Sequence, residues 1–337
     1  LTVLVVGVFA VVLTMGNMLA PVLASIVIAY LLEGLVGSLQ GLGWPRLPSV
    51  LLVYVSFLLF VALVLFGVLP LASRQVTELV QQLPAMITEG TKVLTDLPGR
   101  YPELVTADQI AELIAAIRSE VLSFGQRVLS WSVASVVGII TILVYMILMP
   151  LLVFFFLKDK ELIVDWFKGY MPRYRGIAGT VWADVDRQIS NYVRGKFWEI
   201  LIIWAFSYTT FALFGLRYAM LLALLVGLSV IVPYIGATLV TIPVLLVAWF
   251  QWGWSSQFAW LATAYFIIQA LDGNVLVPLL FSEVVNLHPV AIIVAILVFG
   301  GIWGFWGVFF AIPLATLVQA ILTAWPRHPS TEPESAG

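Results

Sequence analysis

The 337-residue sequence contains no cysteine, only two histidines and few charged residues. Without cysteine, the chain has no disulfide bonds, thiolate nucleophiles or cysteine-ligated metal sites. Charged residues make up 10% of the chain, against roughly 25% in an ordinary soluble domain. The 16 Lys and Arg are balanced by 18 Asp and Glu, which leaves no large basic patch for nucleic acid. These absences exclude a nucleic-acid-binding protein.

Apolar side chains are abundant, at 62% of the residues, and the mean hydropathy is +1.08. A soluble protein of this size cannot cover so much apolar surface with polar groups. We therefore expect an all-α polytopic membrane protein with about eight transmembrane segments, because a helix satisfies its own backbone hydrogen bonds in lipid. The lipid bilayer is the first expected partner, and a soluble enzyme is excluded.

Charge and the length of the apolar runs divide the chain into six parts. We expect N-terminal transmembrane helices at 1–72, an external region of amphipathic helices at 73–132, a transmembrane helix at 133–157, a basic amphipathic cytoplasmic region at 158–196, a C-terminal transmembrane transport region at 197–324 and a disordered cytoplasmic tail at 325–337. The basic region holds eight of the 16 Lys and Arg, and such loops stay in the cytoplasm. Counting spans from it places both chain termini in the cytoplasm.

Two regions outside the expected spans carry amphipathic helical patterns. Thr106 and Gln109 have the spacing of a capping box, and an apolar stripe follows over 107–124. A second stripe covers 177–193. Both stripes need apolar partners outside lipid, which predicts a homo-oligomer without fixing its number of subunits.

Two apolar segments, 218–250 and 289–324, are longer than a single unbroken helix needs to cross the membrane. As single helices each would measure about 50 Å, against a hydrocarbon core of about 30 Å. Their interruptions contain the residues Pro233, Tyr234 and Gly236 in the first segment and Gly300, Gly304, Gly307 and Pro313 in the second. Each segment is either a broken helix that crosses the membrane or a re-entrant hairpin. Two crossings would give eight spans, and two hairpins would give six spans with two half-membrane loops.

Broken helices persist at membrane depth where they face protein or a water-filled cavity. Transporters bind their solutes at such breaks, often in paired positions. The sequence therefore predicts a solute pathway at the two breaks. The alternative is that the glycines only allow helices to pack closely.

Polar residues inside the apolar segments are the remaining candidates. Asp272 is the sharpest, with Asn274 and Pro278 beside it, because a carboxylate in lipid is costly and usually functional. It would accept a coupling proton or bind a cation, unless it lies at the membrane boundary or pairs with a basic group. Secondary candidates for the pathway are Glu33, Asn191, Glu199 and His288. No catalytic, metal-binding or nucleotide-binding arrangement is present in the sequence, so we expect neither an enzyme nor a cofactor.

Four segments carry a family resemblance: SNYVRGKFWEILII at 190–203, IVPYIGATLVTIPVLL at 231–246, GNVLVPLLFSEVVNLHPVAIIVAIL at 273–297 and FGGIWGFWGVFFAIPLATLV at 299–318. They resemble the autoinducer-2 exporter (AI-2E) transporter family, in particular its PerM-like permease branch. The residues that match its motifs are Gly195, Pro233, Tyr234, Gly236, Asn274, Pro278, His288, Pro289, Gly300, Gly304, Gly307 and Pro313.

The resemblance implies a bacterial inner-membrane protein that is usually drawn with eight spans. Some members of the family are associated with export of autoinducer-2 and others with sodium/proton antiport. Our first hypothesis is a secondary transporter of a small solute, such as the signalling molecule autoinducer-2, whose pathway lies among the last four apolar segments. The alternatives are a sodium/proton antiporter with Asp272 as the exchanging carboxylate and a membrane scaffold that transports nothing.

Overall fold

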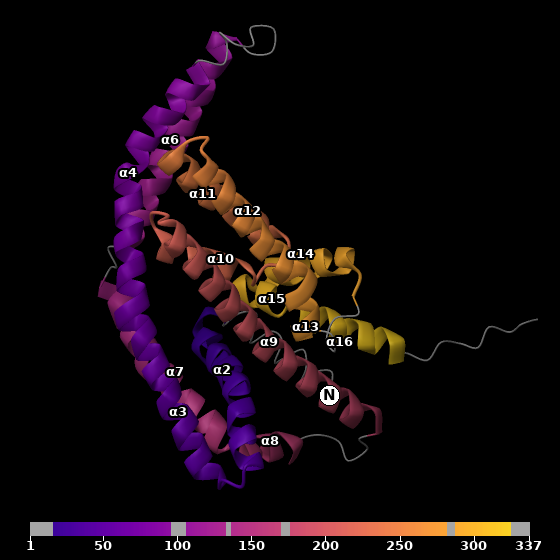
Figure 1. The fold of residues 1–337 in the computed structure, drawn as a ribbon. Helices are drawn as coiled ribbons and strands as arrows, with labels where there is room; N and C mark the ends of the chain where they lie inside the picture. Colours follow the sequence, from indigo (N-terminus) through magenta and orange to yellow (C-terminus); the bar gives the residue numbers. More distant parts are fainter. Residues whose placement is uncertain (1–15, 96–105, 133–135, 170–175, 282–286, 325–337) are drawn as a thin grey trace, which may run out of the picture.

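The computed structural model describes residues 16–95, 106–132, 136–169, 176–281 and 287–324. All regular structure in these ranges is helical (Figure 1). Five of the helices are long and apolar enough to cross a membrane, and shorter apolar helices accompany them. This confirms the all-α polytopic class. Residues 1–15 of the expected N-terminal transmembrane helices and the tail at 325–337 lie outside the described residues.

The N-terminal part is a helix followed by a long rod. The helix is α2 (Gly16–Gly41), and the rod consists of α3 (Arg46–Leu63), the π-helical turn η1 (Val64–Val68) and α4 (Leu69–Thr95). The wide turn comes just before Pro70, which cannot donate a backbone hydrogen bond and crowds the preceding turn. The helix continues through this turn and past the boundary that the sequence places at residue 72.

The amphipathic region folds onto the protein itself. Helix α6 (Ala107–Ser132) lies beside α4 (Figure 1). The predicted capping box is confirmed: the Thr106 N–H donates to Gln109 Oε1 at 3.1 Å, and the Gln109 N–H donates to Thr106 Oγ1 at 3.4 Å. The first stripe thus has a partner within the chain. Association between copies stays a prediction.

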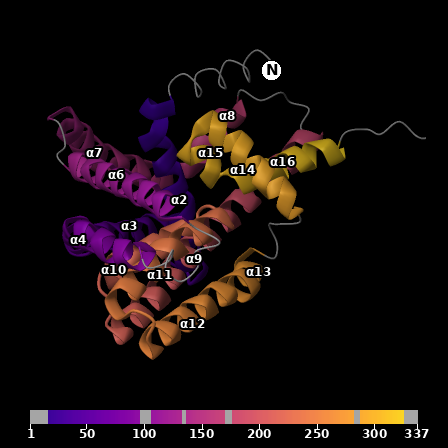
Figure 2. The ribbon, with the colours of Figure 1, turned by 90° about the horizontal axis from the view of Figure 1, so that it is seen from above.

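The rest of the N-terminal half consists of α7 (Val136–Lys158), which packs against α2 and α3, and the short helix α8 (Lys160–Gly169). Helix α9 (Gly176–Phe214) follows as one continuous helix, so the sequence boundary at residue 196 lies within it. It contacts α2, α10, α12, α13 and α16, and Figure 2 shows it in the middle of the C-terminal helices. Helix α9 therefore contacts both C-terminal hairpins and the segment between them.

The overlong segment 218–250 is a helical hairpin of α10 (Ala219–Ser229) and α11 (Ile235–Trp252). Gln251, at the end of α11, accepts a hydrogen bond from the Arg217 N–H at 2.8 Å and donates one to the Gly215 carbonyl at 2.8 Å. The chain therefore leaves the hairpin at the end where it entered. The next helices are α12 (Ser256–Leu271), the π-helical turn η2 (Asp272–Leu276) and α13 (Val277–Phe281).

The second overlong segment also folds back. It consists of α14 (Pro289–Trp303), the short α15 (Phe305–Phe309) and α16 (Ala311–Ala324). Helices α14 and α16 pack against each other, with α15 at the bend (Figure 1). Both long segments thus fold back on themselves as helical hairpins.

Candidate solute and ion site

A cavity of about 520 Å³ lies between α9, the α12–η2–α13 segment and the two hairpins. Its size falls in the range of small-molecule sites. Its polar or charged lining residues are Tyr192, Lys196, Glu199, Tyr234, Thr238, Gln269 and Asp272. The second hairpin contributes the apolar side chains of Ile292 and Ile312. The cavity therefore has a charged wall on α9 and η2 and an apolar wall opposite.

The charged wall contains a buried ion pair. Lys196 and Glu199 are 3% and 2% exposed, and Lys196 Nζ lies 2.6 Å from Glu199 Oε2. The two residues are three apart on α9, so their side chains share one helical face. Pairing is what makes two buried charges tolerable in such surroundings.

Lys196 also joins α9 to the first helix break. Its Nζ donates a second hydrogen bond to the Val230 carbonyl at 2.7 Å, where α10 ends. The same ammonium lies 5.2 Å from the centre of the Phe281 ring, within range of a cation–π attraction. One side chain thus connects the ion pair, the first hairpin and α13.

Asp272 lies on the same cavity, at the first residue of η2. Its Oδ1 atom is buried and has no hydrogen-bond partner among the described residues. Leaving a buried carboxylate oxygen without a partner costs free energy, and a proton, a cation or a donor group of a solute would remove that cost. Its neighbours face elsewhere: the Asn274 amide donates to the Ala270 carbonyl at 2.8 Å, and Pro278 does not line the cavity.

The first break brings Pro233 and Tyr234 to the cavity. Tyr234 is 56% exposed and has φ of 62°, which is uncommon for a bulky residue. Gly236 has a packing role instead, because a Cβ atom there would lie 1.8 Å from the Ser229 carbonyl oxygen. The glycine allows α11 to turn back tightly against α10.

The glycines of the second break pack within their own hairpin. Gly304 lies between α14 and α15 with φ of 57°. A Cβ at Gly307 would lie 1.8 Å from the Phe299 carbonyl oxygen, and one at Gly300 would lie 2.8 Å from a Val308 methyl. These three glycines and Pro313, in the first turn of α16, do not line the cavity. Both hairpins thus depend on a glycine pressed against an earlier carbonyl.

Of the four secondary candidates, one lines the cavity and three do not. Glu199 lies in the site, whereas Glu33 Oε1 pairs with Lys160 at 3.3 Å and with Arg46 at 3.6 Å, near the start of α8. His288 precedes α14, where its Nδ1 accepts the Val290 N–H at 3.3 Å. Asn191 lies on α9 but does not line the cavity.

Four polar residues of the site were not selected from the sequence: Tyr192, Lys196, Thr238 and Gln269. Lys196 is the charged one among them. Its place at the end of the basic region suggests an interfacial anchor, whereas the structure buries Lys196. One sequence signal favours the site: a lysine and a glutamate three residues apart at the start of an apolar helix.

Comparison with known proteins gives consistent matches over nearly the whole chain. A family model described as "AI-2E family transporter" matches residues 1–327. "Putative permease PerM" of Escherichia coli (strain K12) is 48% identical, over 97% of this chain and 92% of the relative. "Putative transport protein YrrI" of Bacillus subtilis (strain 168) is 26% identical, over 94% and 88% respectively. "Putative transport protein YueF" of the same organism is 28% identical, over 82% and 76%.

Proposed function

Since this chain belongs to the AI-2E transporter family, we propose that it is a secondary transporter whose pathway passes through the cavity between α9 and the two hairpins. The observation that carries the proposal is the buried Lys196–Glu199 pair, which shares that cavity with Asp272 and a helix break. Ionisable groups inside apolar segments mark solute and ion pathways. Helix breaks are where secondary transporters bind their solutes.

The lining of the cavity suits a small polar solute. Lys196 offers a donor, while Glu199, Asp272 and the hydroxyl of Thr238 offer acceptors. Such a mixture fits a compact molecule with several oxygen atoms better than a hydrocarbon. Autoinducer-2, whose export the family is associated with, is therefore the first solute to test.

We place the transporter in the bacterial inner membrane with both termini in the cytoplasm. The course of α10–α11 supports the re-entrant alternative, because Gln251 returns to Gly215 and Arg217. The course of α14–α16 supports it in the second segment. This arrangement has six spans and two half-membrane loops.

Cation/proton antiport is the second candidate function, and one observation favours it. The Asp272 Oδ1 atom is buried without a hydrogen-bond partner among the described residues, and a proton or sodium ion would satisfy it. Solute transport and cation/proton antiport would use the same site. A flux that depends on an imposed pH gradient would distinguish proton-coupled transport from passive permeation.

Flux into proteoliposomes tests the proposal. Thr238 lines the cavity, and Thr263 lies on α12 outside it; each hydroxyl donates to the carbonyl four residues earlier. Thr238→Phe should reduce flux of autoinducer-2 or sodium at least tenfold, and the matched control Thr263→Phe should leave it unchanged. Equal flux in both variants would contradict the pathway, and no flux of any solute under any gradient would favour a scaffold.

A further inference from the structure

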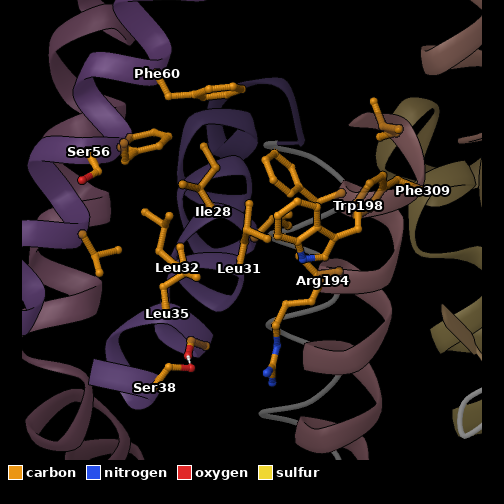
Figure 3. Close-up of a pocket in the computed structure, with 17 residues that line it drawn as sticks. Ile28, Leu31, Leu32, Leu35, Ser38, Ser56, Phe60, Arg194, Trp198 and Phe309 are labelled. Atoms are coloured by element: carbon orange, nitrogen blue, oxygen red, sulfur yellow. Dashed lines mark hydrogen bonds between the residues drawn. The ribbon is translucent and has the colours of Figure 1, made fainter. Parts of the chain in front are cut away.

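A second cavity lies on the other side of α9 and shares no residue with the solute site. It measures about 590 Å³ and is bounded by α2, α3 and α9, with Phe309 of α15 at one edge (Figure 3). The proposed pathway does not use it. It is therefore a separate cavity, and the proposed transport function does not assign a ligand to it.

The walls of this cavity are almost entirely apolar. In Figure 3 the aliphatic side chains of α2 face Phe60 of α3 and Trp198 of α9. The polar side chains among the lining residues are Ser38, Ser56 and Arg194, apart from the indole of Trp198. Both serine hydroxyls donate to carbonyls of their own helices. Of the lining residues within the described part of the chain, only Arg194 carries a charge.

Arg194 reaches across to α2 because of a glycine. A Cβ atom at Gly34 would lie 2.9 Å from the Arg194 Cδ atom, so a larger residue would displace the arginine. The guanidinium points toward the Ser38 end of the cavity (Figure 3). It donates to the Ser190 carbonyl at 3.2 Å and to the Ser190 hydroxyl. No carboxylate of the described residues lies within 4.0 Å of it.

Among the residues that the structure describes, no carboxylate thus neutralises the charge of Arg194. A guanidinium has five N–H donors, and the contacts with Ser190 leave others free. It binds phosphate better than an ammonium does, because its planar fork matches two oxygen atoms. The cavity therefore presents one anion-binding group at the end of an apolar slot.

We propose that this cavity binds an anionic phospholipid, with the phosphate on Arg194 and an acyl chain against the apolar side chains of α2, α3 and α9. A hydrocarbon chain needs no hydrogen-bond partners in the cavity walls, whereas the N–H and C=O groups of a peptide backbone would need polar partners along the slot. A lone cation at one end complements the amphiphile's single charge. The proposal rests on the location of the chain in a membrane and does not depend on transport.

Lipid titration of the purified full chain, followed by native mass spectrometry, tests the proposal. The probes are phosphatidylglycerol and phosphatidylcholine with the same acyl chains, and inorganic phosphate alone. Phosphatidylglycerol should bind most tightly, and Arg194→Gln should weaken it by about tenfold or more, the loss expected for a charge-assisted hydrogen bond. Arg74→Gln is the matched control, because Arg74 is exposed on α4 and does not line the cavity.

A second variant tests the acyl-chain slot with the charge intact. Ser56→Phe fills the apolar part of the cavity, so it should weaken phosphatidylglycerol binding while Arg194 is unchanged. Equal affinity for the two lipids, or unchanged binding by Arg194→Gln, would overturn the proposal. Binding of inorganic phosphate at the lipid's affinity would show a free anion site instead. Cross-linking of Ser56→Cys to a second copy, or to a cysteine placed within residues 1–15, would show that protein covers the slot.

Discussion

Lys196 and Glu199 form a salt bridge of 2.6 Å inside an apolar helix, and the lysine also holds the carbonyl of Val230 where the first hairpin breaks. Glycine residues elsewhere in the two hairpins determine how tightly the chain turns back. The charged site and the hairpin geometry therefore depend on different residues, and separate variants can test them.

Removing one partner of the ion pair should destabilise the protein. Lys196→Met leaves the Glu199 carboxylate buried and unpaired, which costs about 3–5 kcal/mol in comparable sites. Glu199→Gln removes the paired charge but leaves the ammonium its contacts with the Val230 carbonyl and the Phe281 ring, so it should cost less. The double variant should recover much of the loss of Lys196→Met, because no unpaired charge remains. Thermal unfolding in detergent measures all three, and losses that simply add would contradict the pairing.

The hairpin glycines should tolerate no side chain. Gly236→Ala and Gly307→Ala each place a Cβ atom 1.8 Å from a carbonyl oxygen, so we expect a loss of about 3 kcal/mol or more, at the upper end of the cost of overpacking. Gly37→Ala is the control, since its Cβ atom meets nothing within 4 Å. A drop in melting temperature for the first two variants alone checks this prediction.

If Gly236→Ala stayed as stable as the control and lost only flux, the glycine would serve solute passage instead of packing. That result would favour the interpretation in which the breaks expose backbone directly to the solute.

The orientation of the chain can be read from introduced cysteines, because the native sequence has none. Gln109→Cys on α6 should react with an impermeant maleimide from outside the cell. Leu162→Cys on α8, 72% exposed, should react only after the cytoplasmic side is opened. Labelling of Gln109→Cys only from the cytoplasmic side and of Leu162→Cys from outside would show that the proposed orientation is wrong.

Local sequence signals predicted local structure well. The Thr106–Gln109 capping box was predictable because both of its hydrogen bonds lie within four residues. The interruptions near Pro233 and Gly304 were predictable because these residue types favour breaks. The sequence boundary at residue 72 did not match a helix end, because charged side chains do not end a helix whose backbone bonds are internal.

Which residues line the site could not be predicted without the tertiary structure. Whether Gly236 faces a solute or a carbonyl depends on Ser229 lying opposite it, and no spacing rule contains that contact. Likewise, the sequence alone suggests that Lys196 is an interfacial anchor, because its burial depends on the packing of α10 and α13 around it. Asp272 could be selected from the sequence as a polar residue of an apolar segment, and its functional role stays a prediction, but its place beside the ion pair follows from the packing of α12 on α9.

The most direct measurement is solute flux by Asp272→Asn in proteoliposomes, with and without an imposed pH gradient. The amide resembles the protonated acid but does not titrate, so the variant should still carry solute while losing its response to the gradient. Asn274→Ala is the control, because that amide bonds to Ala270 outside the cavity, and it should stay coupled. We predict gradient-dependent flux for the wild type and the control and gradient-independent flux for Asp272→Asn. Flux by Asp272→Asn that still follows the pH gradient would contradict this prediction.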